Sequence, residues 1–248
     1  MTPTPVTNTN TALDQLDFNA FAQRVEAAKR AYCLELFASQ RKSFQIKKEK
    51  TIAKNLEKIF AAALAISNRQ SFHAMSMRDL SRAAGLSIGA LYNYFAGKEE
   101  LLQMMQRQRF TITRRFLDAA LAEADAPQAR LRIAIRTHLY LSEVMQPWFY
   151  FSYMESKNLA PAERKAAVQG ELNTEKIFSD ILTAGVRQGF FDTEDCRMTA
   201  ALIKAMLQDW YLKRVKYARR KIDVDQYSRY LIAFLEKNLL SGESHAPP

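Results

Sequence analysis

The sequence predicts an all-α protein, with a small N-terminal helical domain followed by a larger helical body. Only 7 Gly and 7 Pro occur in 248 residues, which leaves few positions that break helices. Apolar residues recur at spacings of three and four, and no segment alternates apolar and polar residues as a half-buried strand would. Hydrophobic residues make up 48% of the chain, which is enough for a sizeable core.

Residues 1–47 are expected to form an N-terminal extension. Its start, MTPTPVTNTNT, is polar and rich in Thr and Pro, so we expect it to be disordered. From residue 13 to about residue 44 the spacing predicts a helix with one apolar stripe, made by Phe18, Phe21, Val25, Ala28, Tyr32 and Leu36.

Residues 48–100 are expected to form three short helices. The first spans 51–67 and has an inward face of Ile52, Leu56, Ile59, Phe60, Ala63 and Leu64. A loop over 68–75 leads to Ser76, an expected N-cap that Asp79 can complete as a capping box. Gly85 supplies the left-handed residue that ends the second helix, and Ser87 caps a third helix that runs to residue 95.

Residues 101–248 are expected to form the helical body. A long fourth helix runs from 98 to about 123, and further helices are predicted near 127–143, 147–157, 161–188, 194–220 and 223–240. Three prolines fall at expected first turns, where a missing N–H costs least: Pro127, Pro147 and Pro161. Asp192 or Thr193, and Asp223, are expected caps of the last two helices.

The positive charge is concentrated in one part of the chain. Residues 41–109 carry 13 Lys and Arg against 5 Asp and Glu, whereas the whole chain has a net charge of +10. Such a local excess favours a polyanionic partner, although a solvated basic face would give the same count.

The segment 76–102, SMRDLSRAAGLSIGALYNYFAGKEELL, carries the most specific signal. Two short helices joined by a three-residue turn with a glycine form a helix-turn-helix unit, which is a weak signal by spacing alone. The wider string closely resembles the DNA-binding signature of the TetR family of transcriptional regulators. The matching positions are Arg78, Leu80, Ala84, Gly85, Ser87, Gly89, Leu91, Tyr92, Phe95, Lys98, Glu99, Leu101 and Leu102.

The resemblance implies that the third helix enters a DNA groove while its neighbours hold phosphates. Between Ala83 and Gly97 there is no formal charge, and the small surface of Ile88, Gly89 and Ala90 can approach base edges and thymine methyl groups. The expected phosphate or base contacts are Arg78, Ser87, Tyr92, Asn93, Tyr94 and Lys98. The alternative for the tyrosines is that Tyr92 packs against the first helix and Tyr94 is a surface aromatic.

The sequence departs from the family's pattern at three positions. Ser81 replaces a common Ala, Ala90 replaces a frequent Thr, and Ile88 is apolar where many members are polar. We therefore expect specificity to depend on van der Waals contacts, Asn93, Arg78 and DNA shape.

The extension of residues 1–47 lies outside the usual family layout, and two compatible roles are left open. Its helix can pack against the C-terminal body or a partner subunit through Phe18, Phe21 and Val25. Its basic residues can instead form an arm that touches the DNA backbone or minor groove. These residues are Arg41, Lys42, Lys47 and Lys48.

The resemblance also implies an effector pocket and a homodimer. The aromatic cluster QPWFYFSYM at 146–154 is the most conspicuous feature of the body. The candidate pocket residues are Phe110, Arg114, His138, Trp148, Phe149, Phe151, Met154, Phe178, Met206 and Trp210, although an ordinary aromatic core is the alternative. We expect the last two helices to pair with their copies through two faces, one of Ala200, Ile203, Leu207, Tyr211 and Val215, the other of Tyr230, Leu231, Phe234, Leu235 and Leu239.

The resemblance therefore implies a ligand-responsive transcriptional regulator, a repressor that binds a palindromic operator in double-stranded DNA as a dimer and is released by a small apolar or amphipathic effector. Two alternatives stay open: a TetR-like protein without an effector, and a helical scaffold with a basic head. No HExxH, CxxC, GxSxG or Gly-rich phosphate loop is present, so we expect neither catalysis nor a metal or cofactor. Cys33 and Cys196 fit reduced thiols in the cytoplasm, and we expect no signal peptide and no membrane span.

Overall fold

The structure, a computed structural model, describes residues 17–40 and 49–240. Its helices are α1 (Phe18–Gln40), α2 (Glu49–Ser67), α3 (Met77–Ala84), α4 (Ile88–Tyr92), α5 (Lys98–Leu121), α6 (Pro127–Val144), α7 (Gln146–Glu155), α8 (Pro161–Arg187), α9 (Cys196–Leu212), α10 (Arg214–Arg219) and α11 (Val224–Leu239). Two short 3₁₀ turns, η2 (Phe72–Ala74) and η3 (Ser156–Asn158), complete the described segments. The all-α prediction is confirmed, and within the described residues the only β pairing is an isolated bridge between Phe191 and Leu240.

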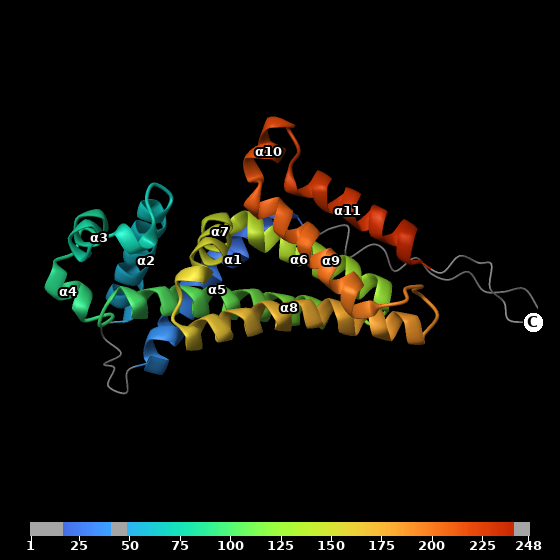
Figure 1. The fold of residues 1–248 in the computed structure, drawn as a ribbon, viewed down its shortest axis with the longest axis horizontal. Helices are drawn as coiled ribbons and strands as arrows, with labels where there is room; N and C mark the ends of the chain where they lie inside the picture. The colour runs from blue at the N-terminus through green and yellow to red at the C-terminus, as the bar shows by residue number, and fades with distance from the viewer. Residues whose placement is uncertain (1–16, 41–48, 241–248) are drawn as a thin grey trace, which may run out of the picture.

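The molecule is elongated, with a reading head at one end and a larger body at the other (Figure 1). The reading head, defined here as α2, η2, α3 and α4, lies at the left of the view. Helix α5 leaves the head and continues into the body, where it packs against α6, α7 and α8. Helices α8 and α9 make the most extensive helix pair of the body, and α11 lies against α6.

The helix caps of the reading head have the geometry that the sequence predicted. Ser76 Oγ accepts a hydrogen bond from the Asp79 amide at 3.1 Å, and an Asp79 carboxylate oxygen accepts one from the Ser76 amide at 3.0 Å, so the predicted capping box is present. Gly85 ends α3 with φ 65°, which is the left-handed conformation expected there. Ser87 caps α4 by accepting the Ala90 amide at 3.1 Å.

Helix α4 is shorter than predicted, because it ends at Tyr92 rather than at residue 95. The next amides bond three residues back, from Asn93 to the Ala90 carbonyl and from Tyr94 to the Leu91 carbonyl. This tighter turn lets Leu91 and Phe95 both point into the core, where they are fully buried together with Leu80.

The N-terminal helix α1 packs inside the protomer, against α2, α5 and α6. Phe21 and Val25 are buried, and the Phe21 ring meets the rings of Phe116 and Tyr140 with centroids 5.5 Å and 5.6 Å apart. The prediction that this helix packs on the body is therefore confirmed, and it also touches the head. The predicted basic arm, Arg41, Lys42, Lys47 and Lys48, lies outside the described residues.

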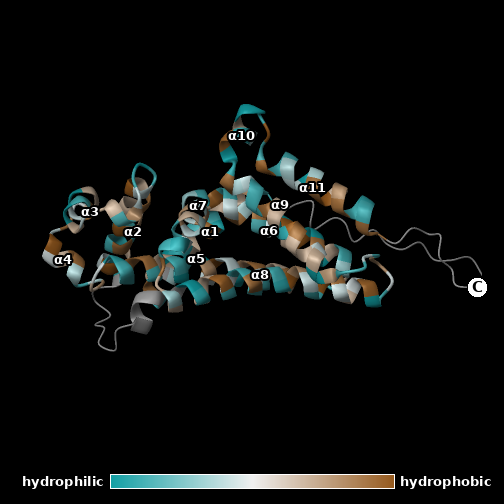
Figure 2. Cartoon of the chain, viewed as in Figure 1, coloured by the Kyte–Doolittle hydropathy of each residue, from teal (hydrophilic) through white to brown (hydrophobic). Residues whose placement is uncertain are grey.

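Burial along the chain follows the helical period. Figure 2 shows brown and teal alternating along α5, α8 and α9, as expected for helices with one face on the core. Among the largest fully buried side chains are Trp210, Tyr140, Tyr211, Phe149 and Phe178. In the described residues, no helix is both long and apolar enough to cross a bilayer.

Two predictions about the last helices are wrong. The expected helix 194–220 is broken at Lys213, whose φ of −117° and ψ of 33° separate α9 from α10. This break lets Tyr217 fold back against Trp210, with ring centroids 5.0 Å apart. The cap of α9 is Asp195 rather than Asp192 or Thr193, because Asp192 donates its amide to Leu239 and belongs to the bridged segment.

The predicted dimer faces are largely wrong as well. Ala200, Ile203, Leu207 and Tyr211 are buried inside the protomer, and so are Leu231, Leu235 and Leu239. Three predicted residues, Val215, Tyr230 and Phe234, are exposed as expected, and on α9 the exposed apolar residues are Met198 and Leu202, which the prediction did not include. Met198 and Leu202 are four residues apart on α9, as Tyr230 and Phe234 are on α11, so each pair lies on one side of its helix.

Candidate nucleic-acid interface and effector cavity

The exposed surface of α4 is small and uncharged. Gly89 is exposed, and a Cβ built on it meets no atom within 4 Å. Ile88 is exposed to 37%, Ala90 is half-buried, and Asn93 is exposed just beyond the helix. The outer face of α4 therefore carries little bulk and no charge.

The turn between α3 and α4 is held more tightly than the sequence indicated. Ser81 Oγ donates to the Leu86 carbonyl at 2.5 Å, and the Leu86 amide donates to the Ser81 carbonyl at 3.1 Å. Ser81, read from the sequence only as a small substitute for Ala, therefore fixes the angle between the two helices.

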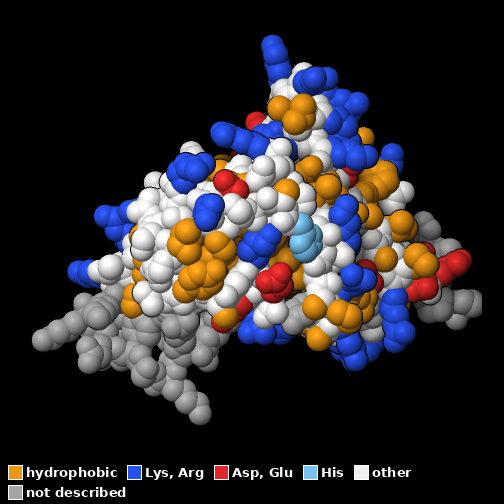
Figure 3. Space-filling model, turned by 60° about the vertical axis from the view of Figure 1, so that its left-hand side comes forward, with side chains coloured by type: hydrophobic (Ala, Val, Ile, Leu, Met, Phe, Trp, Pro, Cys, Tyr) orange, Lys and Arg blue, Asp and Glu red, His pale blue; other side chains and the backbone are white. Residues whose placement is uncertain are grey.

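Polar groups that can meet phosphates surround α4. Arg78 and Tyr92 are exposed, and Tyr92 is accessible to 49%. Ser87 uses its hydroxyl oxygen to cap α4, which leaves its O–H to donate. Figure 3 turns this end of the molecule toward the viewer and shows hydrophobic and basic side chains interspersed over the surface.

Lys98 lies at the first residue of α5, where the helix dipole favours an anion. Its ammonium donates to the His73 carbonyl at 2.7 Å, which leaves two further N–H groups for a phosphate. Lys98 thus joins η2 to the start of α5 and faces the same end of the head as α4.

Tyr94 lies differently from the other predicted DNA contacts. Its residue is only 8% exposed, and its hydroxyl accepts a hydrogen bond from Asn55 Nδ2 at 2.7 Å. The tyrosine that packs against the first helix of the head is therefore Tyr94, and the exposed one is Tyr92, which is the reverse of the alternative considered from the sequence.

The head is attached to the body through α7. The Phe60 ring packs edge-on against Trp148, with centroids 5.3 Å apart, and Phe72 packs against Phe151 at 5.5 Å. The Phe72 amide donates to the buried Glu155 carboxylate at 3.3 Å. Trp148 and Phe151, predicted to line an effector pocket, thus form this head–body junction.

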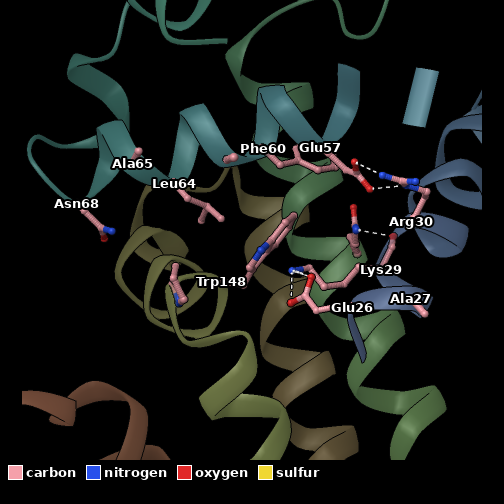
Figure 4. Close-up of a pocket in the computed structure, with 13 residues that line it drawn as sticks. Glu26, Ala27, Lys29, Arg30, Glu57, Phe60, Leu64, Ala65, Asn68 and Trp148 are labelled. Carbon is pink, nitrogen blue, oxygen red and sulfur yellow. Dashed lines mark hydrogen bonds and ion pairs between the residues drawn. The ribbon is translucent and has the colours of Figure 1, made fainter. Parts of the chain in front are cut away.

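A cleft of about 870 Å³ opens beside the junction, between α1, α2 and α7 (Figure 4). Phe60, Leu64 and Trp148 line its apolar side. At its edge, Arg30 pairs with Glu57 at 2.8 Å and Lys29 pairs with Glu26 at 2.9 Å. These charges are already paired with each other, so the cleft presents few free polar groups to a ligand.

A second cavity, of about 490 Å³ and called here the effector cavity, lies between α5, α7, α8 and α9. Its lining includes Gln106, Arg109, Phe110, Ser152, Glu171 and Lys204. The Glu171 carboxylate pairs with Arg109 at 2.9 Å and with Lys204 at 3.0 Å. The Lys204 ammonium also lies 3.3 Å from Nε2 of the fully buried His138.

The structure does not bring the ten predicted pocket residues together. Phe110 lines the effector cavity, whereas Trp148 lines the cleft and Phe151 belongs to the junction. Arg114 is exposed and pairs with Asp118 at 2.7 Å, and Met154 is exposed to 42%. The others are packed in or against the core: His138, Phe149, Phe178, Met206 and Trp210.

The polar residues of the effector cavity were missed from the sequence. Gln106, Arg109 and Thr113 recur on the buried face of α5, and Lys204 interrupts the apolar face of α9. A charged residue on a buried helical face was the available signal. Arg109 was counted in the basic segment, but the structure buries it in the body, where it lines the second cavity.

Within the described ranges, no group of three or more His, Cys, Asp and Glu side chains could hold a metal ion. Cys196 is a free, partly buried thiol.

Comparisons with known proteins match both parts of the chain. The family model "Bacterial regulatory proteins, tetR family" matches residues 59–105, and "Tetracyclin repressor-like, C-terminal domain" matches residues 124–213. Helix α1 precedes both matches.

Similar proteins cover most of the chain at low identity. The transcriptional regulator HbdR of Aromatoleum sp. (strain CIB) is 20% identical over 191 residues, which are 77% of this chain and 80% of HbdR. The ketosteroid regulator KstR2 of Mycobacterium tuberculosis has a similar fold, with a TM-score of 0.65, 17% identity, and coverage of 75% of this chain and 95% of KstR2. AibR, solved with isovaleryl coenzyme A and operator DNA, has a TM-score of 0.61, 15% identity, and coverage of 73% and 97%.

Proposed function

Because the chain belongs to the TetR family of helix-turn-helix transcriptional regulators, we propose that it represses transcription by binding a palindromic operator as a homodimer and that a small effector releases it. Regulators of this family bind DNA and are not enzymes. The observation that carries the DNA-binding part is the small uncharged surface of α4, capped by Ser87 and flanked by Arg78, Tyr92 and Lys98.

The residues of this surface have different roles in DNA binding, which follow from their chemistry. Ile88, Gly89 and Ala90 supply close van der Waals contact with base edges, and Asn93 supplies a hydrogen-bonding side chain. Arg78, Ser87, Tyr92 and Lys98 contact phosphates, which sets the orientation of α4 and most of the affinity. Tyr94 acts by packing α4 against α2, since its hydroxyl is bonded to Asn55.

The dimer is built on the exposed apolar face of α9 and α11, made by Met198, Leu202, Tyr230 and Phe234. Large apolar side chains exposed at regular helical spacing are typical of an interface. Two-fold symmetry is needed because two copies of α4 must meet successive major grooves about 34–36 Å apart.

The effector acts through two elements that join the effector cavity to the head. Helix α5 carries Arg109 in the cavity and Lys98 at its start, about 16 Å away along the helix axis. Gln106 Nε2 on α5 donates to the Ser152 carbonyl on α7 at 3.1 Å, and the neighbouring Phe151 packs on Phe72 of the head. A shift of either helix would therefore change the spacing of the two heads.

The basic arm is a separate part of the proposal. Replacing Arg41, Lys42, Lys47 and Lys48 together by Gln should weaken binding to all DNA sequences and reduce its salt dependence, if these residues contact phosphates. An unchanged salt dependence would mean that these residues do not contact DNA and that the extension only packs against the rest of the protomer.

The test is selection of bound sequences from a random pool of duplex DNA, followed by affinity measurements at several salt concentrations. A symmetric selected site would support both the reading head and the dimer. With six to ten phosphate contacts, affinity should fall by roughly 10³–10⁵ between 50 and 200 mM salt. A helical scaffold with a basic head would select no sequence, and that outcome would overturn the proposal.

A further inference from the structure

The effector cavity carries an excess of positive charge. Its lining includes four basic side chains, Arg109, Lys157, Arg164 and Lys204, and two acidic ones, Glu171 and Glu175. Lys157 is exposed at the edge, whereas Arg109 and Lys204 are buried, with side chains only 5% and 6% exposed. The excess of positive charge therefore extends into the buried part of the cavity, where water does not screen it.

One carboxylate serves both buried cations. Glu171 pairs with the Arg109 guanidinium through one oxygen and with the Lys204 ammonium through the other. Burying a charge without a partner is costly, and the two buried cations share Glu171 as their direct ion-pair partner, while Glu175 acts on Lys204 through its charge alone. His138 is neutral and so does not change this balance, because burial and the nearby Lys204 hold its pKa well below its ordinary value.

Two buried donor groups at the cavity have no hydrogen-bond acceptor among the described residues. They are Nε of Arg109 and the hydroxyl of Ser152. Both residues line the cavity, and buried donors of this kind are normally paired. A ligand with acceptor oxygens would supply the missing partners, and a guanidinium is well suited to a planar carboxylate.

The rest of the lining is apolar. Phe110, Val168 and Leu172 line the cavity, and Val168 and Leu172 are about half exposed in the protein alone. Phe110 is held against α8 by the absence of a side chain at Gly170, where a Cβ would lie 2.5 Å from the ring. A further space of about 600 Å³ continues past Phe110 and gives room for a longer apolar group.

We propose that the effector cavity binds a small amphipathic organic carboxylate. Its carboxylate pairs with Arg109 and Lys204 beside Glu171 and accepts from Ser152, while its apolar part lies along Phe110, Val168 and Leu172. The role of this compound as the effector rests on the proposed function, whereas its binding to the cavity does not.

A cationic ligand fits the cavity less well. Both oxygens of Glu171 are already paired, and the face of the Phe110 ring is covered by the Arg109 guanidinium at 3.9 Å from its centroid. The two features that commonly bind an ammonium group, a free carboxylate and an open aromatic face, are therefore occupied.

The test compares matched probes on the full-length protein without DNA. Octanoate and benzoate are the carboxylates, octanamide and benzamide are their neutral counterparts, and octylamine is the cation. Binding is measured by calorimetry and by the shift of the unfolding temperature, which rises with occupancy. We expect at least one carboxylate to bind, and to bind at least about tenfold more tightly than its amide, because charge-assisted hydrogen bonds exceed neutral ones.

Two variants assign the binding to this cavity. Lys204→Gln removes one cation and keeps the Arg109–Glu171 pair, so the fold should persist while carboxylate affinity falls by about tenfold or more. The control is Lys176→Gln, which removes an exposed lysine that pairs with Asp180 on the outer side of α8. It should leave carboxylate affinity unchanged.

Three results would overturn the inference: no carboxylate binding at concentrations up to about 10 mM, equal binding of carboxylate and amide, or unchanged affinity in Lys204→Gln. Tighter binding of octylamine would overturn it in favour of a cation. These measurements contain no DNA, so their failure is separate from a failure to select an operator, which would count against the proposed function alone.

Discussion

At the residue scale, Gly89 is the position where a side chain would most directly obstruct DNA. The space around it is open, so a larger residue fits the free protein without disturbing its neighbours. We predict that Gly89→Glu abolishes sequence-selective binding, because it places bulk and negative charge on the surface of α4 that meets the bases. Thermal unfolding and fluorescence anisotropy with operator DNA measure the two effects separately.

The control for Gly89→Glu is Gln70→Glu, which adds the same charge to an exposed residue of the head away from α4. It should weaken DNA binding only slightly and keep the sequence preference. Retained operator binding by Gly89→Glu would show that α4 does not read the bases.

Lys98 has two roles that a substitution can separate. We predict that Lys98→Ala weakens binding to all sequences about equally and lowers the slope of log affinity against log salt by about 0.9 for each phosphate that the protein no longer neutralises. Salt titrations of operator and of unrelated DNA measure this effect, with Lys176→Ala in the body as the control. A weakening confined to one base pair would contradict the phosphate role.

Removal of the hydrogen bond to the His73 carbonyl should appear separately as a small decrease in the stability of the Lys98→Ala protein.

Glu171 is the residue whose protonation should matter most to the body. Burial alone would raise the pKa of its carboxyl, but the charges of Lys204 and Arg109 lower that pKa to about 2. A pKa below that of the unfolded chain means that the ionised group stabilises the fold above about pH 4.5, and that this contribution is lost as the pH falls toward about 2.

We predict that Glu171→Gln lowers the free energy of unfolding at neutral pH by about 3 kcal/mol, because it leaves two buried cations without their anion. Urea unfolding between pH 7 and pH 3 should then show a smaller acid-dependent loss in the variant than in the native chain. Parallel pH profiles would show that the carboxylate is not held by its two partners.

At the element scale, α1 lies before the residues that the family models match, and it is nevertheless part of the core. Its two ion pairs to other helices, Arg30 with Glu57 and Arg115 with Glu35, are exposed and contribute little. Its stability contribution comes instead from Phe21 and Val25, which are buried against α2, α5 and α6.

We predict that Phe21→Ala lowers the free energy of unfolding by about 3 kcal/mol, the usual cost of emptying a buried phenylalanine site. Chemical denaturation measures the loss, and Gln23→Ala on the exposed side of the same helix is the control. A cost below about 1 kcal/mol would mean that α1 is only loosely attached to the body.

Helix α7 contacts two different parts of the molecule. Trp148, Phe151 and Glu155 contact the head, and Ser152 and Tyr153 line the effector cavity. The aromatic cluster that suggested an effector pocket is therefore mostly the joint between the two parts of the molecule. Helix α7 thus contacts both the head and the cavity, so a small rotation of α7 would change both sets of contacts.

At the scale of the whole molecule, the assembly decides whether the head can recognise a symmetric site. We predict that Leu202→Glu converts the dimer into a monomer, because Leu202 is 58% exposed in the protomer and lies beside Met198. Light scattering during gel filtration measures the mass, and operator affinity should fall at least about tenfold because each half-site then binds alone.

Ala119→Glu is the matched control, since it adds the same charge to an exposed position of α5 away from α9 and α11. It should leave the mass and the operator affinity unchanged. A dimeric Leu202→Glu protein would place the interface on another surface.

Elements whose signals are local can be predicted from the amino-acid sequence without knowledge of the fold. The capping box of Ser76 and Asp79, the left-handed Gly85 and the Ser87 cap were all predictable, because each interaction joins residues within a few positions of one another. The same holds for the all-α fold and for the buried faces of α1 and α2, where the helical period places apolar residues on one side.

Contacts between residues that are far apart in the sequence could be identified only in the folded structure. Arg109 and Glu171 are 62 positions apart, and Phe72 and Glu155 are 83 apart, so no spacing rule connects them. The dimer face of α9 and part of that of α11 were assigned wrongly for the same reason, since an apolar stripe does not reveal whether its partner belongs to the same chain or to a second one. Only packing of α6, α7 and α8 against those stripes left Met198, Leu202, Tyr230 and Phe234 at the surface.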